Sequence, residues 1–175
     1  MRKTEEEIHH LLQDFSDKLP HFSDGRIDYS KTKTAPVLTV FVTYKEKFIL
    51  LKRSNKVRTY QGKWNTVAGY LDNPEQTLFE KILEELKEEL DITKDQISSY
   101  SFGQKYQFTD KKNNKTWIVH PTLVTLLKKP SITLNWEHTE YTWIKADEIK
   151  KYDTVPNLKE SMKRAVMLVH TKTNH

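Results

Sequence analysis

Residues 69–92 read GYLDNPEQTLFEKILEELKEELDI, and the second half of this stretch combines a leucine repeat with closely spaced glutamates. At about 100° per residue the apolar side chains of a helix would share one arc that can pack on a core. These side chains are Phe79, Ile82, Leu83, Leu86 and Leu90. Glu85, Glu88 and Glu89 are three and four residues apart, so they project together from a neighbouring arc. The stretch predicts an amphipathic helix with a carboxylate patch beside its buried face.

The carboxylate patch has two interpretations. Carboxylates at this density repel one another unless water or a cation screens them, and Mg²⁺ and Mn²⁺ prefer oxygen ligands. The patch is therefore a candidate metal platform. The alternative is a solvated helix face on which Lys81 pairs with Glu85 at the i, i+4 spacing.

The residues before the helix favour a compact strand, loop and helix unit. Asn73 is a suitable N-cap, Pro74 suits the first helical position, and Gln76 can complete a capping box. Residues 64–69 have the pattern of a short strand that runs into Gly69, where the backbone can bend or approach another group closely.

This unit resembles the signature of the Nudix hydrolase family. The signature is a glycine, five residues, a glutamate, seven residues, and then Arg-Glu-apolar-any-Glu-Glu-any-Gly-apolar. Gly69 and Glu75 match the opening. The closing is matched by Glu85, Leu86, Glu88, Glu89 and Ile92. The resemblance extends over about residues 35–165, from the strand-like segment 48–53 and Gly62-Lys63-Trp64 to the late segment 136–144.

The sequence departs from the signature at three points. Eight residues separate Glu75 from Glu84, Glu84 stands where the family has arginine, and Asp91 stands where it has glycine. In the family the arginine orients the glutamates. The resemblance therefore implies that another basic residue, Lys81 or Arg53, holds the site, or that the activity is reduced or altered.

The resemblance implies an α/β fold, a Nudix-type α/β/α sandwich with a mixed β-sheet, here with an N-terminal helical extension. It also implies hydrolysis of a diphosphate linkage in a nucleoside diphosphate joined to another group, with Mg²⁺, or alternatively Mn²⁺, as cofactor. The implied metal ligands are Gly69 through its carbonyl, Glu85, Glu88, Glu89 and Glu137. The same glutamates are the candidate catalytic groups, with Glu137 as the favoured base and Glu140 as the second choice.

Two further groups of residues are candidates for substrate binding. Arg53, Arg58 and Lys63 belong to a basic segment next to the acidic unit, where they can grip phosphate groups; the alternative is a plain solvated loop. Tyr106 and Trp117 flank the predicted turn at residues 113–114 and can stack on a base or ribose. The alternative for both rings is packing on a sheet face.

The remaining pattern divides the chain into an N-terminal helix and connection (1–34), a Nudix domain (35–170) and a frayed tail (171–175). Helices are expected at 4–18 and 157–169, and strands at 37–44, 47–53 and 141–144. Residues 98–109 and 116–127 are β-rich and should pair antiparallel across the turn at 110–114. This order implies a mixed sheet that is covered on both faces.

The whole composition restricts the possible functions. The chain has 175 residues, 36% of them hydrophobic, and a formal charge of +5, which suits one soluble domain. No segment approaches the ~20 apolar residues of a membrane span, and the first residues lack the apolar part of a secretory signal, so we expect a cytoplasmic protein without a membrane partner. The basic residues are spread out and form no nucleic-acid-binding motif.

Three functional hypotheses remain. The first is a metal-dependent Nudix pyrophosphohydrolase acting on a small nucleoside diphosphate derivative. The second is a catalytically silent Nudix-fold module that binds a nucleotide or a protein, which Glu84 in the arginine position would suit. The third is an isopentenyl-diphosphate isomerase-like protein, but such proteins normally use a catalytic cysteine and this chain has none. A homodimer is possible, because dimers are frequent among the relatives.

Overall fold

The computed structural model describes residues 3–170, with side chains to residue 167, and within this part eight strands form one mixed sheet. The strands are β1 Thr34–Tyr44, β2 Lys47–Arg53, β3 Trp64–Asn65, β4 Val67–Tyr70, β5 Ile97–Phe102, β6 Tyr106–Asp110, β7 Lys115–Leu126 and β8 His138–Ile144. The helices are α1 Lys3–Ser16, α2 Leu78–Leu90 and α3 Leu158–His170, with 3₁₀ helices η1 Lys94–Gln96 and η2 Ala146–Lys151. The predicted frayed tail lies outside the described residues.

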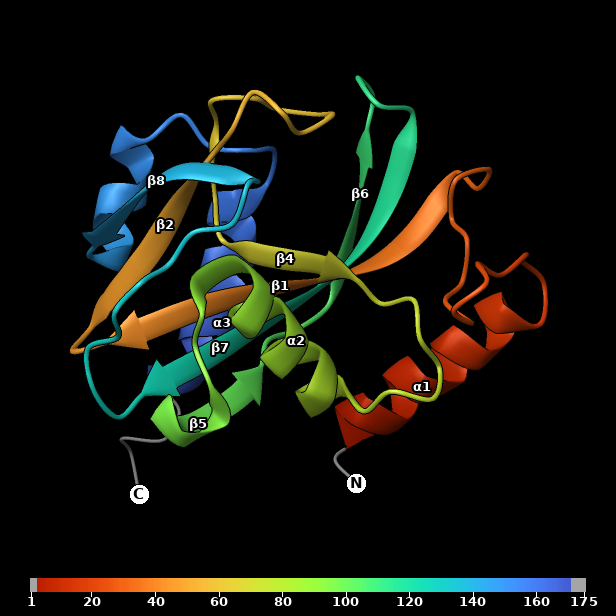
Figure 1. Cartoon of the computed structure of the whole chain (residues 1–175), viewed down its shortest axis with the longest axis horizontal. Helices are drawn as coiled ribbons and strands as arrows, with labels where there is room; N and C mark the ends of the chain where they lie inside the picture. Colours follow the sequence, from red (N-terminus) through yellow and green to blue (C-terminus); the bar gives the residue numbers. More distant parts are fainter. Residues whose placement is uncertain (1–2, 171–175) are drawn as a thin grey trace.

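The long strands β1 and β7 run parallel through the centre of the sheet, from the pair Thr34 and Thr116 to the pair Thr43 and Thr125 (Figure 1). All other named strand pairs within the described residues are antiparallel. β2 and β4 both pair with β1, while β5 and β6 both pair with β7. The mixed sheet that the sequence predicts is therefore confirmed.

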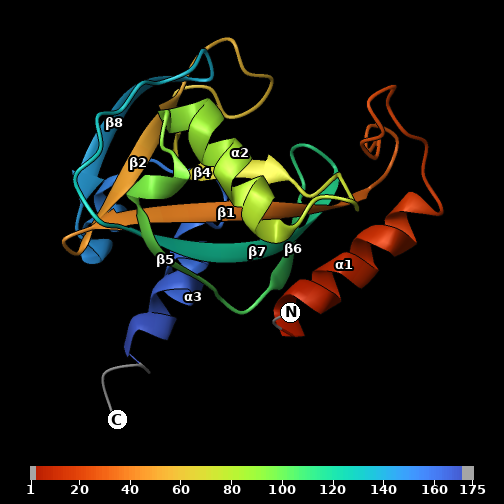
Figure 2. The ribbon, with the colours of Figure 1, turned by 60° about the horizontal axis from the view of Figure 1, so that its bottom comes forward.

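The helices cover the two faces of this sheet (Figure 2). Ile82, Leu86 and Leu90 of α2 are fully buried against one face, in a cluster that also contains Ile8 and Leu12 of α1. On the opposite face, α3 contributes a second cluster with Phe41, Leu50 and Leu123 of the sheet. The apolar arc of residues 78–90 thus becomes the buried face of α2, and its acidic arc remains beside the sheet edge.

Helix α2 begins later than the sequence predicts. Its N-cap is Thr77, whose hydroxyl accepts a hydrogen bond from the Glu80 N–H (3.2 Å), while the Glu80 carboxylate accepts one from the Thr77 N–H (2.8 Å). The prediction of Asn73 as N-cap was wrong, because Asn73 instead caps a turn by accepting from the Glu75 N–H (3.0 Å). Two overlapping capping patterns occur in the sequence, and the second one starts the helix.

The predicted β-rich run 98–109 is split into β5 and β6 at Gly103. A Cβ atom at Gly103 would lie 2.6 Å from the Arg164 carbonyl oxygen, so the chain can pass α3 here only without a side chain. β5 and β6 then pair antiparallel with different parts of β7, as the sequence predicts for the two segments.

The segment between α1 and β1 is fastened to the loop that leads into α2. The Ile27 N–H donates to the Asp72 carbonyl oxygen (2.7 Å), and the Tyr29 hydroxyl donates to the Leu71 carbonyl oxygen (2.8 Å). Ile27 and Tyr29 are both buried. Residues ahead of β1 therefore form part of the wall around the acidic helix.

None of the helices in the described range 3–170 has both the length and the apolar character needed to cross a bilayer.

Candidate active site

Gly69 of β4 brings the strand backbone against the carboxylate of Glu85 on α2. A Cβ atom built on Gly69 would lie only 1.9 Å from Glu85 Oε1 and 2.3 Å from its carboxyl carbon. A side chain at this position would displace the Glu85 carboxylate, so this contact depends on the small size of glycine and not on its backbone angles. The sequence correctly predicts a close approach at Gly69, and the approaching group is a candidate metal ligand.

Glu89 lies one turn further along α2 and is almost completely buried. Its Oε1 accepts a hydrogen bond from the Ala68 N–H (3.3 Å), whereas its Oε2 has no hydrogen-bond partner among the described residues. Burial, reinforced by the charges of Glu85 and Glu137, raises the pKa of Glu89 well above its usual range. A buried carboxylate oxygen without a partner is costly unless a proton or a cation occupies it.

His138 does not neutralise Glu89. Its Nε2 is 3.7 Å from Glu89 Oε2, which is an ion pair only if the imidazole is protonated. Burial, and to a smaller extent the charge of Arg53, lowers the pKa of His138 to about 4. The ring is therefore neutral at ordinary pH and leaves the charge of an ionised Glu89 uncompensated.

Glu85 shares the environment of Glu89 but has a cationic partner. Burial raises the pKa of Glu85 to about 7, and the charge and hydrogen bond of Lys81 oppose this rise. Lys81 Nζ lies 2.8 Å from Glu85 Oε1 and 2.8 Å from Glu84 Oε1. Burial alone would lower the pKa of Lys81, but the carboxylates of Glu85 and Glu84 outweigh it and raise that pKa. The pair that the sequence suggests for a solvated face is instead buried.

The raised pKa of Glu85 predicts how the stability of the metal-free protein depends on pH. A glutamate with an ordinary pKa of 4.5 when unfolded and about 7 when folded binds more protons in the folded state between these values. Its contribution to the free energy of unfolding is complete below 4.5 and is lost as the pH rises through 7. Relative to Glu85→Gln, the wild-type protein in EDTA should lose about 1–3 kcal/mol between about pH 5 and about pH 8.

Denaturant unfolding of both proteins at the two pH values measures this loss. Subtracting the variant from the wild type cancels the contributions of the buried histidines, whose lowered pKa values act in the opposite direction. Identical pH dependence in the two proteins would contradict the prediction.

Glu85, Glu88, Gly69 and Glu137 line one cavity of about 1090 Å³. Glu88 is exposed on α2. Glu137 lies half-buried in the loop before β8, where its Oε1 accepts from Asn135 Nδ2 (3.4 Å). Glu140 lies outside this lining and pairs with Lys52 on the surface (2.8 Å).

The donor atoms of this cavity fit a hard divalent cation, but they do not form a closed coordination shell. No group of three or more His, Cys, Asp or Glu side chains in the described part of the chain is gathered closely enough to hold an ion as it lies. The raised pKa values of Glu85 and Glu89 nevertheless mark two buried carboxylates, and the Oε2 of Glu89 has no hydrogen-bond partner among the described residues. Oxygen ligands of this kind suit Mg²⁺ and Mn²⁺.

The contacts of Glu84 favour a different register for the acidic motif. Glu75 is exposed, and the side chain that faces Glu84 is Gln76, whose Nε2 donates to Glu84 Oε2 (2.5 Å). Seven residues separate Gln76 from Glu84, which is the spacing that the signature has between its first glutamate and its arginine. The contact therefore favours Gln76 over Glu75 as the counterpart of the opening glutamate, with the extra residue in the loop after Gly69.

The predicted substrate-binding residues divide into two groups. Arg53, Arg58, Tyr106 and Trp117 line the cavity. Lys63 does not line it, because its Nζ pairs with Asp153 (2.5 Å) on the surface. Arg53 Nε donates to the Thr59 carbonyl oxygen (2.9 Å), so this side chain holds the basic loop in shape. Arg58 has no ion pair within the described residues.

Tyr106 is engaged by its neighbours. Its hydroxyl bonds the Ser161 hydroxyl (2.6 Å), and the Arg164 guanidinium lies 4.7 Å from the ring centroid. The ring therefore forms a fixed wall beside α3. Trp117 instead contacts Tyr70 of β4.

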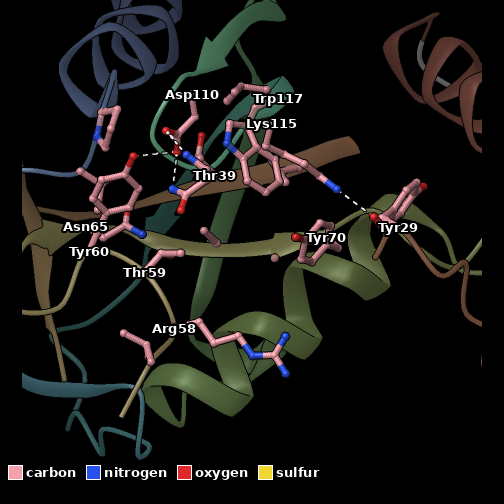
Figure 3. Close-up of a pocket in the computed structure, with 18 of the residues that line it drawn as sticks. Tyr29, Thr39, Arg58, Thr59, Tyr60, Asn65, Tyr70, Asp110, Lys115 and Trp117 are labelled. Atoms are coloured by element: carbon pink, nitrogen blue, oxygen red, sulfur yellow. Dashed lines mark hydrogen bonds between the residues drawn. The ribbon is translucent and has the colours of Figure 1, made fainter. Parts of the chain in front are cut away.

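Tyr29, Tyr70 and Trp117 form an aromatic shelf that the sequence does not predict as a unit (Figure 3). The Tyr70 ring stacks on Tyr29 with centroids 5.8 Å apart, and Trp117 lies 5.7 Å from Tyr70. Lys115 holds the backbone that carries Tyr29, because its Nζ donates to the carbonyl oxygens of Tyr29 and Thr32 (2.8 Å each). Tyr70 is 41% exposed, so the shelf presents an aromatic surface to the cavity.

A second unpredicted contact joins the basic loop to the β6–β7 hairpin. The Tyr60 hydroxyl donates to Asp110 Oδ2 (2.7 Å), and Asn113 Nδ2 donates to the same oxygen (2.7 Å), as Figure 3 shows. The only sequence signal for this contact is a lone aspartate at a turn. The contact closes one side of the cavity.

Comparison with known proteins identifies the class of this fold and site. The NUDIX domain matches residues 32–165, and the chain therefore belongs to the NUDIX domain family. The Nudix fold and the family resemblance predicted from the sequence are confirmed, and with them the assignment of the chain to the Nudix pyrophosphohydrolases.

Individual relatives agree with this assignment. The nucleoside triphosphatase NudI of Klebsiella pneumoniae (strain 342) is 25% identical over 112 residues, which are 61% of this chain and 78% of the relative. The structure of a MutT protein from Methanosarcina mazei Go1 has a TM-score of 0.62 at 22% identity and covers 83% of this chain and 99% of its own. An Ap4A hydrolase from C. elegans has a TM-score of 0.59 at 18% identity, covering 80% and 99%.

A third similar structure contains a nucleotide. The NUDIX domain of Shewanella oneidensis NrtR, solved with ADP ribose, has a TM-score of 0.61 at 12% identity and covers 78% of this chain and 87% of its own. At these identities the solved structures establish the fold alone.

Proposed function

We propose that this chain hydrolyses a diphosphate linkage in a nucleoside diphosphate joined to another group, with a divalent cation as cofactor. The observation that carries the proposal is a pair of buried carboxylates one turn apart on α2, both with raised pKa values. Glu85 lies against Gly69 and lines a cavity of about 1090 Å³, and Glu89 Oε1 accepts from the neighbouring Ala68 N–H. Buried acids with perturbed pKa values are typical of functional sites.

In this proposal Glu85 and Glu89 hold Mg²⁺ or Mn²⁺, with Glu88, Glu137 and the Gly69 carbonyl as further ligands. The bound cation would neutralise charge on the phosphate oxygens and acidify a water molecule. The exposed side chain of Glu88 has the freedom to join the two buried carboxylates. Glu137 lines the same cavity and takes the proton of the attacking water as general base.

The substrate lies between the acidic helix and the aromatic shelf. Arg58 lines the cavity without an ion pair among the described residues and binds phosphate oxygens. Trp117 and Tyr70 stack on the nucleobase, since an exposed aromatic surface inside a polar cavity suits a flat ring. The Ap4A hydrolase and the ADP-ribose complex among the similar structures support adenine nucleotides as the first substrates to test.

A substrate panel tests the proposal. The protein is incubated with Mg²⁺ or Mn²⁺ and with nucleoside triphosphates, ADP-ribose, dinucleoside polyphosphates, nucleotide sugars and coenzyme A, and the products are separated by chromatography. We expect hydrolysis of at least one class with the cation and a loss of at least about 10²-fold in EDTA. The control is the same panel with Glu89→Gln. Turnover that persists in EDTA would contradict the proposed cofactor.

The alternative is a silent nucleotide-binding module, which is favoured by the absence of a closed metal shell among the described residues. In that case isothermal titration would detect nucleotide binding without any product in the panel.

A further inference from the structure

Lys81 is a buried cation beside the candidate metal site. Its side chain is 6% exposed, and its Nζ faces three carboxylates, those of Glu85 (2.8 Å), Glu84 (2.8 Å) and Asp72 (3.8 Å). A buried ammonium is tolerated only when it is paired in this way. The three acids carry more charge than one lysine neutralises, so Lys81 reduces the repulsion at this end of α2 without abolishing it.

The contact with Lys81 fixes one particular oxygen of Glu85. Oε1, which accepts from Lys81, is also the atom that packs against the Gly69 backbone. The carboxylate is therefore held from two sides. Its orientation toward the cavity is set before any ligand arrives.

Lys81 is itself held by residues that have no other evident role. Glu84 accepts from Lys81 through Oε1 and from Gln76 through Oε2 (2.5 Å), so its carboxylate joins the loop to the lysine. Asp72 lies 3.6 Å from Arg26 Nη1 on its other side. Glu84, at the position where the family signature has arginine, thus holds Lys81 one turn earlier in the helix by an ion pair.

We infer that Lys81 is a positioning residue that presents the Glu85 carboxylate to the divalent cation. This inference rests on the proposed function. Arg53, the other basic residue that the sequence suggests for this role, is committed to the Thr59 carbonyl oxygen. The inference explains why the chain can carry Glu84 in the arginine position and still orient its acidic helix.

Binding of Mn²⁺ in the absence of substrate tests the inference directly. Free Mn²⁺ is titrated by electron paramagnetic resonance against wild-type protein, Lys81→Met, Lys81→Arg and Lys87→Met. Removing a group that orients a metal ligand costs about 10–100-fold in affinity, and we expect this loss in Lys81→Met. Lys81→Arg, which keeps the cation, should recover affinity to within about fivefold of wild type.

Lys87→Met is the matched control. Lys87 lies on the same helix, is exposed and pairs with Asp91 on the surface, so the substitution removes the same charge away from the cavity. Surface pairs contribute little, and its Mn²⁺ affinity should stay within about threefold of wild type. A matching loss in Lys87→Met would mean that a general disturbance of α2, and not the position of Lys81, controls binding, and would overturn the inference.

Glu84→Gln covers the case in which Lys81→Met does not fold. The substitution removes the ion pair between Lys81 and Glu84 but leaves the ion pair between Lys81 and Glu85. We expect a loss of at least about threefold in Mn²⁺ affinity. Wild-type affinity in Glu84→Gln, or equal or tighter binding in Lys81→Met, would overturn the inference while leaving the proposed function intact. A wild-type protein that neither binds Mn²⁺ nor hydrolyses any member of the panel would overturn both.

Discussion

Glu89→Gln is expected to lower kcat by about 10³-fold while leaving the folded structure intact. The carboxylate is 3% exposed and one of its oxygens has no hydrogen-bond partner in the described part of the chain, so its charge has no structural role that an amide would fail to replace. An amide of the same shape removes the charge and with it the attraction for a divalent cation. The measurement is kcat at saturating Mg²⁺, together with the free energy of unfolding in EDTA.

The control is Glu46→Gln, which makes the same chemical change in the exposed turn between β1 and β2. Its kcat should remain within about twofold of wild type, because surface charge substitutions have small effects. Wild-type kcat in Glu89→Gln would remove this carboxylate from the proposed site. A large loss of stability would show instead that Glu89 is mainly structural.

Gly69→Ala is expected to reduce kcat by at least about 10²-fold. Even a small displacement of the Glu85 carboxylate, the proposed metal ligand, has an effect of this size. The new Cβ would lie 1.9 Å from Glu85 Oε1, so the Glu85 carboxylate must leave its place beside β4. The same overlap should lower the free energy of unfolding by about 1–3 kcal/mol.

A double variant separates the steric effect from a general disturbance of β4. In Gly69→Ala with Glu85→Ala the overlapping carboxylate is absent, so the combined loss of stability should be smaller than the sum of the two single losses. The double variant should remain inactive. Additive losses of stability would show that the contact between Gly69 and Glu85 is not the source of the effect.

The acidic helix could be predicted from the sequence because its information is local. The spacing of Ile82, Leu86 and Leu90 defines the buried face of α2, and the same spacing places Glu85 and Glu89 beside it. The two interpretations of the acidic arc proved compatible, since the pair of Lys81 and Glu85 exists but is buried in the site. Burial depends on β4 and on the preceding loop, which helical periodicity does not describe.

The predictions from sequence failed in two situations. In one, two local patterns competed for the same residues, and in the other, the feature was formed by segments that are distant in the sequence. The start of α2 had two overlapping capping patterns, and the register of the signature depended on where the loop takes its extra residue. Lys63 belongs to a basic segment, yet its partner Asp153 lies 90 residues away. The aromatic shelf joins Tyr29, from the connection between α1 and β1, with Tyr70 of β4 and Trp117 of β7, so no short stretch of sequence contains it.

The hydrogen bonds from residues 27 and 29 to the loop before α2 make the chain ahead of the matched domain a part of the cavity wall. The Tyr29 ring stacks on the ring of Tyr70, and its hydroxyl donates a hydrogen bond to the carbonyl oxygen of Leu71, two residues beyond Gly69. If the aromatic shelf binds the nucleobase as proposed, variation in this leading stretch will change which nucleoside is accepted without any change in the signature residues. Relatives that share the acidic helix but differ before β1 should be sorted by that stretch when their substrates are compared.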